Sequence, residues 1–175
     1  MNNLFSHSKF NGNISRWNVS NVRNMNSMFH NSLFDGNISS WDVSNVTDMS
    51  SMFLYAKFKG DISSWDVHNV KNMKDMFNWT TFNGDLSSWD VSNVTNMEGM
   101  FRDSSFNGDI SNWDVSNVRN MSKMFFQAWF DGDLNNWNTK SLIDIDGIFY
   151  CSGVANHLPK WFDPDKDSMY PYVAR

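Results

Sequence analysis

The feature that most constrains this chain is a 24-residue repeat, of which one unit reads FNGDLSSWDVSNVTNMEGMFRDSS and spans residues 82–105. A tryptophan, a glycine and a phenylalanine each recur at the same interval. The tryptophans are Trp17, Trp41, Trp65, Trp89, Trp113, Trp137 and Trp161. No residue is inserted or deleted between Met1 and Phe149. A fixed period of this length is typical of stacked repeat proteins, in which each unit buries its apolar side chains against its neighbours.

The repeat predicts one elongated domain over residues 1–153, followed by a degenerate repeat and C-terminal cap over residues 154–175. Residues 1–9 match the second half of a unit. The full units are 10–33, 34–57, 58–81, 82–105 and 106–129, with a drifting sixth unit at 130–153. All 3 prolines lie in the last segment. This is expected of a segment that hides the last open edge of a stack.

Composition excludes several classes of protein. A hydrophobic content of 41% with 16% aromatic residues argues against disorder. The net charge of −5 argues against a nucleic-acid-binding protein and against binding to anionic membranes. No apolar run is long enough to insert into a membrane, and residues 1–9 lack the pattern of a signal peptide. The single cysteine, Cys151, forms no disulfide within the chain and is expected to be a buried thiol.

Within one unit the spacing of apolar residues changes halfway. Apolar and polar residues alternate over residues 86–92, which predicts a half-buried strand. Over residues 94–101 the apolar residues recur at intervals of three and four, which predicts a short helix or helical turn with Ser92 or Asn93 as its N-cap. Gly84 is expected to adopt a positive φ in the preceding turn. The sequence therefore predicts an α/β repeat solenoid, with a parallel β-strand ladder and one short helix per coil.

The spacing of the apolar residues is that of one class of leucine-rich repeats. In the second unit these residues are Ile38, Trp41, Val43, Val46, Met49, Met52 and Phe53. With its motif W-D-V-S-N-V-x-N-M-x-x-M-F, the chain resembles the BspA-like leucine-rich repeats of bacterial surface proteins over residues 1–149, with a weaker trace to Trp161. That resemblance implies a curved solenoid at the surface of a cell or particle, or outside the cell, that is used for adhesion. Similar arrays occur in viral genomes, so a bacterial and a viral origin both stay open.

The first candidate site is a row of aspartates beside the core tryptophans. Stacking places Asp42, Asp66, Asp90 and Asp114 side by side, with His68 on the same outward face. Carboxylates at this spacing repel one another unless they are neutralised, and a calcium ion would neutralise them. The alternative is that each carboxylate accepts hydrogen bonds from the backbone amides of the Ser-Asn turn that follows it. The chain matches no known calcium-binding loop, which favours this alternative and predicts no cofactor.

The second candidate site lies in the columns that differ between units. Its large aromatic residues are Tyr55, Trp79, Phe126, Trp129 and Tyr150. Because Tyr55 and Trp79 share one column in adjacent units, we expect them to be neighbours. Exposed aromatic residues in one patch are typical of surfaces that bind a protein or a sugar. The alternative is that these side chains fold over the helix ends and fill local gaps.

No motif for catalysis stands out. The histidines fall in four different columns, and none pairs with a cysteine or a carboxylate at metal-ligand spacing. They are His7, His30, His68 and His157. We therefore predict a non-enzymatic binding or adhesion module whose partner is a host or cell-surface protein or glycan. The alternative is a structural spacer or an assembly component of a surface layer or viral particle, and the oligomeric state stays open.

Overall fold

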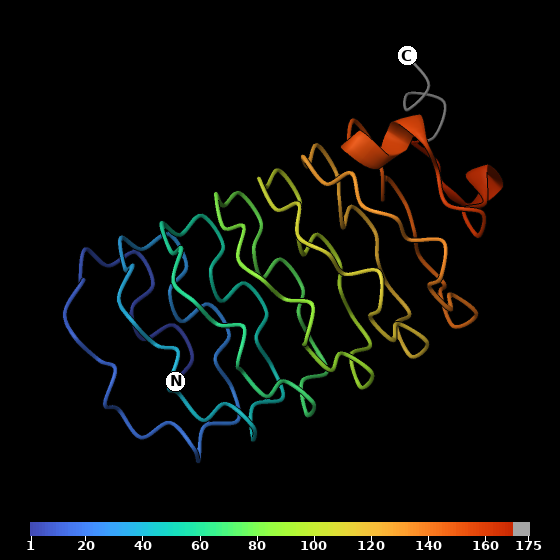
Figure 1. Cartoon of the computed structure of the whole chain (residues 1–175). Coiled ribbons are helices and arrows are strands. Elements are labelled where there is room, and N and C mark those ends of the chain that lie inside the picture. The colour runs from blue at the N-terminus through green and yellow to red at the C-terminus, as the bar shows by residue number, and fades with distance from the viewer. Residues whose placement is uncertain (170–175) are drawn as a thin grey trace.

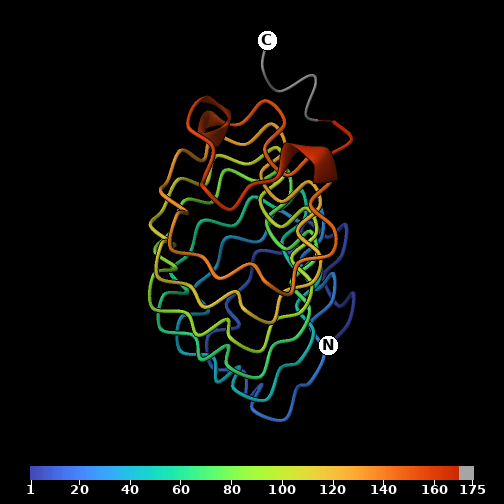
Figure 2. The same cartoon turned by 90° about the vertical axis from the view of Figure 1, so that its right-hand side faces the viewer.

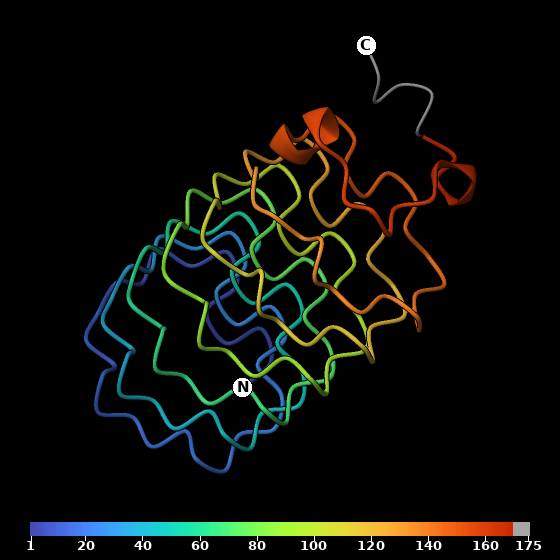
Figure 3. The ribbon, with the colours of Figure 1, turned by 45° about the vertical axis from the view of Figure 1, so that its right-hand side comes forward.

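The computed structural model describes residues 1–169 and shows the chain wound into a stack of coils (Figure 1). Each coil lies against the next from the N-terminus to the C-terminus. Seen after a rotation of 90°, the coils lie over one another within a single elongated outline (Figure 2). The intermediate view shows the same turn of the chain recurring in every coil (Figure 3). Residues one repeat apart in the sequence are therefore neighbours in space.

The predicted α/β architecture is wrong. Residues 1–169 contain no α-helix and no strand, and their regular elements are two 3-10 helices, η1 (Gly153–Asn156) and η2 (Pro164–Lys166). Adjacent coils are joined instead by isolated parallel bridges at one position per unit, for example between Asn72 and Asn96. The strand ladder of a leucine-rich repeat is absent from this part of the chain. The interpretation as a leucine-rich-repeat solenoid is therefore wrong as well.

The segment predicted as a helix divides its backbone hydrogen bonds between two coils. The N–H groups of Met97, Gly99 and Phe101 each donate to a carbonyl of the next coil at 2.9 Å. The intervening N–H of Met100 donates to the carbonyl of Met97, three residues back, at 3.2 Å. Gly99 has a φ of +59°, which interrupts any right-handed helix and places a left-handed residue third in the turn. The segment is therefore a chain of turns that bond sideways to the next coil.

Left-handed residues recur at two positions of the repeat, and this explains why the departure from helix is systematic. In the full units they are Ser27, Asn31, Ser51, Tyr55, Asp75, Trp79, Gly99, Asp103, Lys123, Gln127, Gly147 and Cys151. The predicted N-cap has no helix to cap. The side-chain amide of Asn93 instead donates to the carbonyl of His68 in the preceding coil at 2.8 Å.

The segment predicted as a strand also forms turns. The N–H of Trp89 donates to the carbonyl of Leu86 at 3.1 Å, and that of Val94 donates to the carbonyl of Val91 at 2.9 Å. These donors are used within one coil, so they cannot pair with a neighbouring strand. The alternation of apolar and polar residues still places Trp89 and Val91 in the core, with 3% and 1% of their surfaces exposed.

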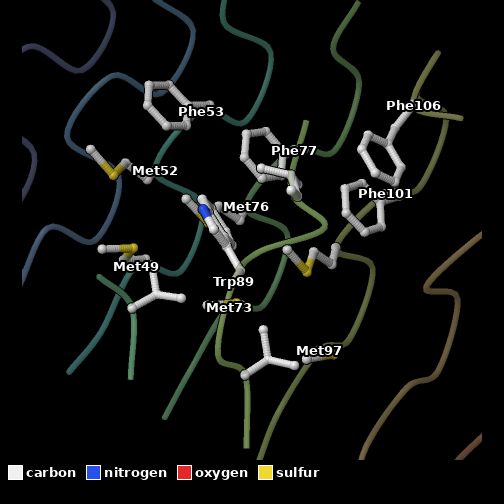
Figure 4. Close-up of a cluster of buried hydrophobic side chains, with 14 of the residues drawn as sticks. Met49, Met52, Phe53, Met73, Met76, Phe77, Trp89, Met97, Phe101 and Phe106 are labelled. Carbon is white, nitrogen blue, oxygen red and sulfur yellow. The ribbon is translucent and has the colours of Figure 1, made fainter. Parts of the chain in front are cut away.

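The core consists of columns of equivalent side chains that stack from coil to coil. The ring centroid of Phe77 lies 5.7 Å from that of Phe53 and 5.8 Å from that of Phe101. Buried methionines form the adjoining columns, as Figure 4 shows for Met49, Met73 and other residues. Methionine adapts its shape to irregular gaps, so it suits a core bounded by turns instead of regular elements. Each unit can bury these side chains only with a neighbour on both sides.

The tryptophan column adds hydrogen bonds between coils. The indole N–H of Trp89 donates to the carbonyl of Ile62 in the preceding coil at 3.1 Å, and Trp113 bonds Leu86 in the same way at 3.0 Å. The same carbonyl also accepts a backbone N–H from its own coil, as that of Leu86 does from Trp89. The indole therefore adds a second hydrogen bond to a buried carbonyl and links adjacent coils, which a leucine at this position could not do. This explains why the column holds tryptophan.

Two expectations about single residues are also wrong. Gly84 is not among the glycines with positive φ, which in the described chain are Gly99 and Gly147. A Cβ at Gly84 would instead lie 2.7 Å from the ring of Phe82, so the glycine makes room for that ring. Cys151 is exposed, although the sequence suggested a buried thiol.

Residues 154–169 lie over the last coil. The indole of Trp161 keeps the register of the repeat and donates to the carbonyl of Leu134 at 2.8 Å. Asp167 is buried, and its carboxylate accepts the N–H of Gly147 at 2.8 Å. The predicted cap extended to residue 175, and its last part, residues 170–175, lies outside the described residues.

Candidate functional site

Each aspartate of the predicted row begins a turn of its own. The Oδ1 atoms of Asp42, Asp66, Asp90 and Asp114 accept the backbone N–H two residues later at 3.1, 3.2, 3.0 and 3.0 Å. The hydrogen bonds that the turn alternative predicts are therefore confirmed. The hydroxyl and then the N–H of Ser92 lower the pKa of Asp90 by bonding its charged form. Asp42 and Asp114 have lowered pKa values for the same reason.

The side chain of His68 joins this row through Asp66. Its Nδ1 lies 2.7 Å from Oδ1 of Asp66, in the place that a serine hydroxyl takes in other units. The sequence predicted no carboxylate partner for His68, because Asp66 lies only two positions away, which is not a metal-ligand spacing. Among residues 1–169, no group of three or more histidine, cysteine, aspartate or glutamate side chains gathers in a way that could hold a metal ion.

The predicted contact between Tyr55 and Trp79 is confirmed. Their ring centroids lie 5.7 Å apart with an interplanar angle of 24°, and 48% and 52% of the two residues are exposed. The row continues toward the N-terminus, because the ring of His30 lies 6.4 Å from Tyr55 and 4.8 Å from His7. We call His7, His30, Tyr55 and Trp79 the aromatic edge. The shared column of His7 and Tyr55 is the signal that could have revealed this extension.

The other predicted aromatic residues do not join this edge into one patch. Phe126 and Tyr150 are half-buried and stack on each other at 4.7 Å, and the guanidinium of Arg102 lies 5.1 Å from the Phe126 centroid. This group fits the alternative in which side chains fill a local gap. Trp129 is 75% exposed, and its ring contacts no other ring of the described chain. The structure thus separates the predicted patch into three places.

The backbone fixes the two central residues of the aromatic edge. Tyr55 and Trp79 have φ values of +57° and +55°, which are uncommon for bulky side chains. The N–H of Tyr55 donates to the carbonyl of Asn78 at 3.0 Å, and that of Trp79 donates to the carbonyl of Arg102 at 2.9 Å. Each ring therefore projects from a turn that is bonded to the next coil.

Comparison with known proteins places the chain in a family. Residues 1–81 and 55–161 match the family described as "Mycoplasma protein of unknown function, DUF285". The chain belongs to the DUF285 family. No curated protein and no solved structure matches it. Within this DUF285 chain, no helix of residues 1–169 is long and apolar enough to cross a membrane.

Proposed function

We propose that this DUF285 chain is a non-enzymatic binding module that attaches to a protein or glycan on the surface of a cell. The observation that carries the proposal is the stacked pair of Tyr55 and Trp79, each about half exposed. Aromatic rings supply large apolar contact area with few rotatable bonds, and they are enriched where proteins bind other molecules. A flat pair of such rings suits either a sugar ring or an apolar side chain.

The rigidity of the coils supports the same proposal. A surface that is already ordered loses little conformational entropy when it binds a partner. Tyr55 and Trp79 are ordered by the hydrogen bonds between coils and by their mutual stacking. The variable columns of a stacked repeat can therefore present side chains at fixed spacing without affecting the core.

The expected location is the cell surface or the extracellular space. The resemblance of the repeat motif to that of BspA-like surface proteins supports this location and supports adhesion as the use, even though the coils lack the strands of a leucine-rich repeat. No group of side chains described above has the geometry of a catalytic site, so the proposal includes no reaction and no cofactor.

A second candidate function is assembly, and one observation favours it. Apolar side chains gather at the surface of the first coil, where Leu4, Phe10 and Trp17 are 49%, 37% and 39% exposed. Such side chains could join sister copies in a surface layer or a viral particle, as a structural component would. Sedimentation of the wild-type chain and of Leu4→Asp/Phe10→Asp tests this function. Association that the double variant abolishes, without binding to cells, would favour assembly.

Binding of labelled protein to intact cells tests the proposed adhesion. The key variant is Tyr55→Asn/Trp79→Asn, because Asn31 occupies the same column with a φ of +49°. Asparagine tolerates this backbone and removes both rings. Trp129→Asn is the matched control, since it removes an exposed ring elsewhere. We expect the double variant to lose binding and the control to keep it.

Treatment of the cells identifies the type of partner. Signal lost after periodate indicates a glycan, and signal lost after protease indicates a protein. Binding to no cell panel, or equal binding by the wild type and a folded Tyr55→Asn/Trp79→Asn variant, would refute the role of the aromatic edge.

A further inference from the structure

A polar groove crosses the middle coils at columns other than those of the aromatic edge. It is open to solvent and has a volume of about 340 Å³. We call it the cation groove, and it is lined by Lys71, Asn93, Thr95, Asn117, Arg119 and Ser141.

The cations of the groove belong to one column that alternates with threonine. The column holds Arg23, Thr47, Lys71, Thr95 and Arg119, and it ends with Ile143. The N–H of Lys71 donates to the carbonyl of Thr47, that of Thr95 to Lys71, and that of Arg119 to Thr95, each at 2.9 Å. These bonds hold adjacent coils in direct contact, and hydrogen-bonded chains lie about 4.8 Å apart. Since a cation recurs at every second coil, successive cations of the column start from backbones about 10 Å apart.

These cations are not neutralised by the protein. Arg23, Lys71 and Arg119 form no ion pair with any residue between 1 and 169. The positions that follow Lys71 and Arg119 carry amides, Asn72 and Asn120. The coils that adjoin these amides carry Asp48 and Asp144 in the same column, and neither carboxylate forms an ion pair within residues 1–169. A row of unpaired cations on a chain of net charge −5 favours an anionic partner.

The lining between the cations is polar and suits hydroxyl groups. Asn93 and Asn117 use their amide N–H groups to donate to carbonyls of the preceding coil, at 2.8 and 2.7 Å. Their Oδ1 atoms face no protein donor within the described chain and can accept from a ligand. No aromatic side chain lines the groove, so it lacks the stacking platforms that single-stranded nucleic acids use.

We propose that the cation groove binds an extended acidic polysaccharide that carries sulfate or carboxylate groups at regular intervals. Lys71 and Arg119 pair with successive anionic groups, and the asparagines between them accept hydrogen bonds from sugar hydroxyls. The inference deepens the proposed adhesion, on which it rests, by naming a class of glycan and a second contact surface. A polysaccharide that occupies the groove also leaves the aromatic edge free for its own partner.

Direct binding to defined fragments tests the inference. The probes for fluorescence anisotropy are labelled heparin and hyaluronan hexasaccharides, a neutral dextran fragment and a short single-stranded DNA. We expect binding of the sulfated or the carboxylated fragment, weakened by salt, and none of dextran or DNA. Lys71→Gln/Arg119→Gln should weaken binding about tenfold or more, because two charge-assisted contacts are lost.

Two further variants control for net charge and for folding. Lys57→Gln/Lys59→Gln removes the same two charges at exposed positions outside the groove and should leave affinity within about twofold of wild type. Thr95→Lys fills the gap between Lys71 and Arg119 and should tighten binding.

The outcomes separate the two proposals. No binding of either acidic fragment, equal weakening by both double variants, or tighter binding of DNA would overturn the inference. If the acidic fragments fail while adhesion still depends on Tyr55 and Trp79, the groove inference fails and the proposed function stands. If the fragments bind through Lys71 and Arg119 but no cell is bound, the proposed function fails and the groove stays an anion site.

Discussion

Trp89 and Trp79 show how two regions of the coil stack use the same residue type. Trp89 is 3% exposed, and its indole N–H donates to the carbonyl of Ile62 at 3.1 Å. Trp79 is 52% exposed and stacks on Tyr55. The first belongs to a column that holds tryptophan in every unit, whereas the second belongs to a column that varies. The comparison teaches that the repeated columns hold the coils together, while the variable columns are free to contact a partner.

Removal of the Trp89 ring and of the Trp79 ring should change the free energy of unfolding by very different amounts. Trp89→Ala should lower the free energy of unfolding by about 3–5 kcal/mol, because it leaves a cavity and removes the indole hydrogen bond to the preceding coil. Trp79→Asn should change it by less than about 1 kcal/mol, since the ring is exposed and asparagine fits the backbone. Urea unfolding of both variants measures the difference. Equal losses of stability would contradict the division into core and edge.

The glycine column offers a second test, of steric fit. Gly84→Ala should cost about 1–3 kcal/mol, because the added Cβ would lie 2.7 Å from the ring of Phe82. The cost should shrink in a Phe82→Leu background, where the ring is absent. A double-mutant cycle by urea unfolding measures this coupling. A cost that is the same in both backgrounds would mean that the backbone, and not the ring, requires glycine.

The repeat period predicted the columns but not the backbone between them. Burial of Trp89 and contact between Tyr55 and Trp79 followed from the period, because coils in register place equivalent residues together. The backbone conformation could not be predicted from the period, because a helical turn and a series of consecutive turns space their apolar residues alike. Asp75 and Trp79 stand at two left-handed positions of the repeat that glycine seldom marks, since it occurs only at Gly99 and Gly147 in the first and at no described residue of the second.

The aromatic edge and the cation groove differed in how easily they could be recognised from the sequence. Aromatic residues at the edge stood out because their columns otherwise hold polar residues. The cation groove did not stand out, because Lys71 and Arg119 are separated by Thr95 and look like surface variation in any single unit. Only the stacking of alternate coils makes them a row.

Hydrogen bonds between coils give a third and smaller effect. The amide of Asn93 donates to the carbonyl of His68 at 2.8 Å from an exposed position. Asn93→Ala should therefore lower the free energy of unfolding by about 0.5–1.5 kcal/mol. Asn136→Ala is the matched control, because Asn136 is exposed and its side chain bonds no described residue. Thermal unfolding that affects both variants equally would count against the bond as a contributor to stability.

The smallest effect concerns two carboxylates with opposite pKa shifts. Burial raises the pKa of Asp75, although the amide of Asn78 donates to its Oδ1 at 2.8 Å. The folded state therefore holds this proton more tightly than the unfolded state, and stability falls as pH rises from the ordinary carboxyl pKa through the raised one. Asp90, with its lowered pKa, contributes stability above the ordinary pKa and loses it as pH falls through the lowered value.

Replacement by asparagine should thus act in opposite directions at the two sites. Asp75→Asn keeps an oxygen for Asn78 and removes a half-buried charge, so it should raise Tm at neutral pH. The gain should vanish in acid, where the wild-type carboxyl is already protonated. Asp90→Asn should lower Tm slightly at neutral pH, because the amide accepts the bonds of Ser92 less strongly than the carboxylate does. Calorimetry of both variants across pH would refute the assignment if the two curves moved in the same direction.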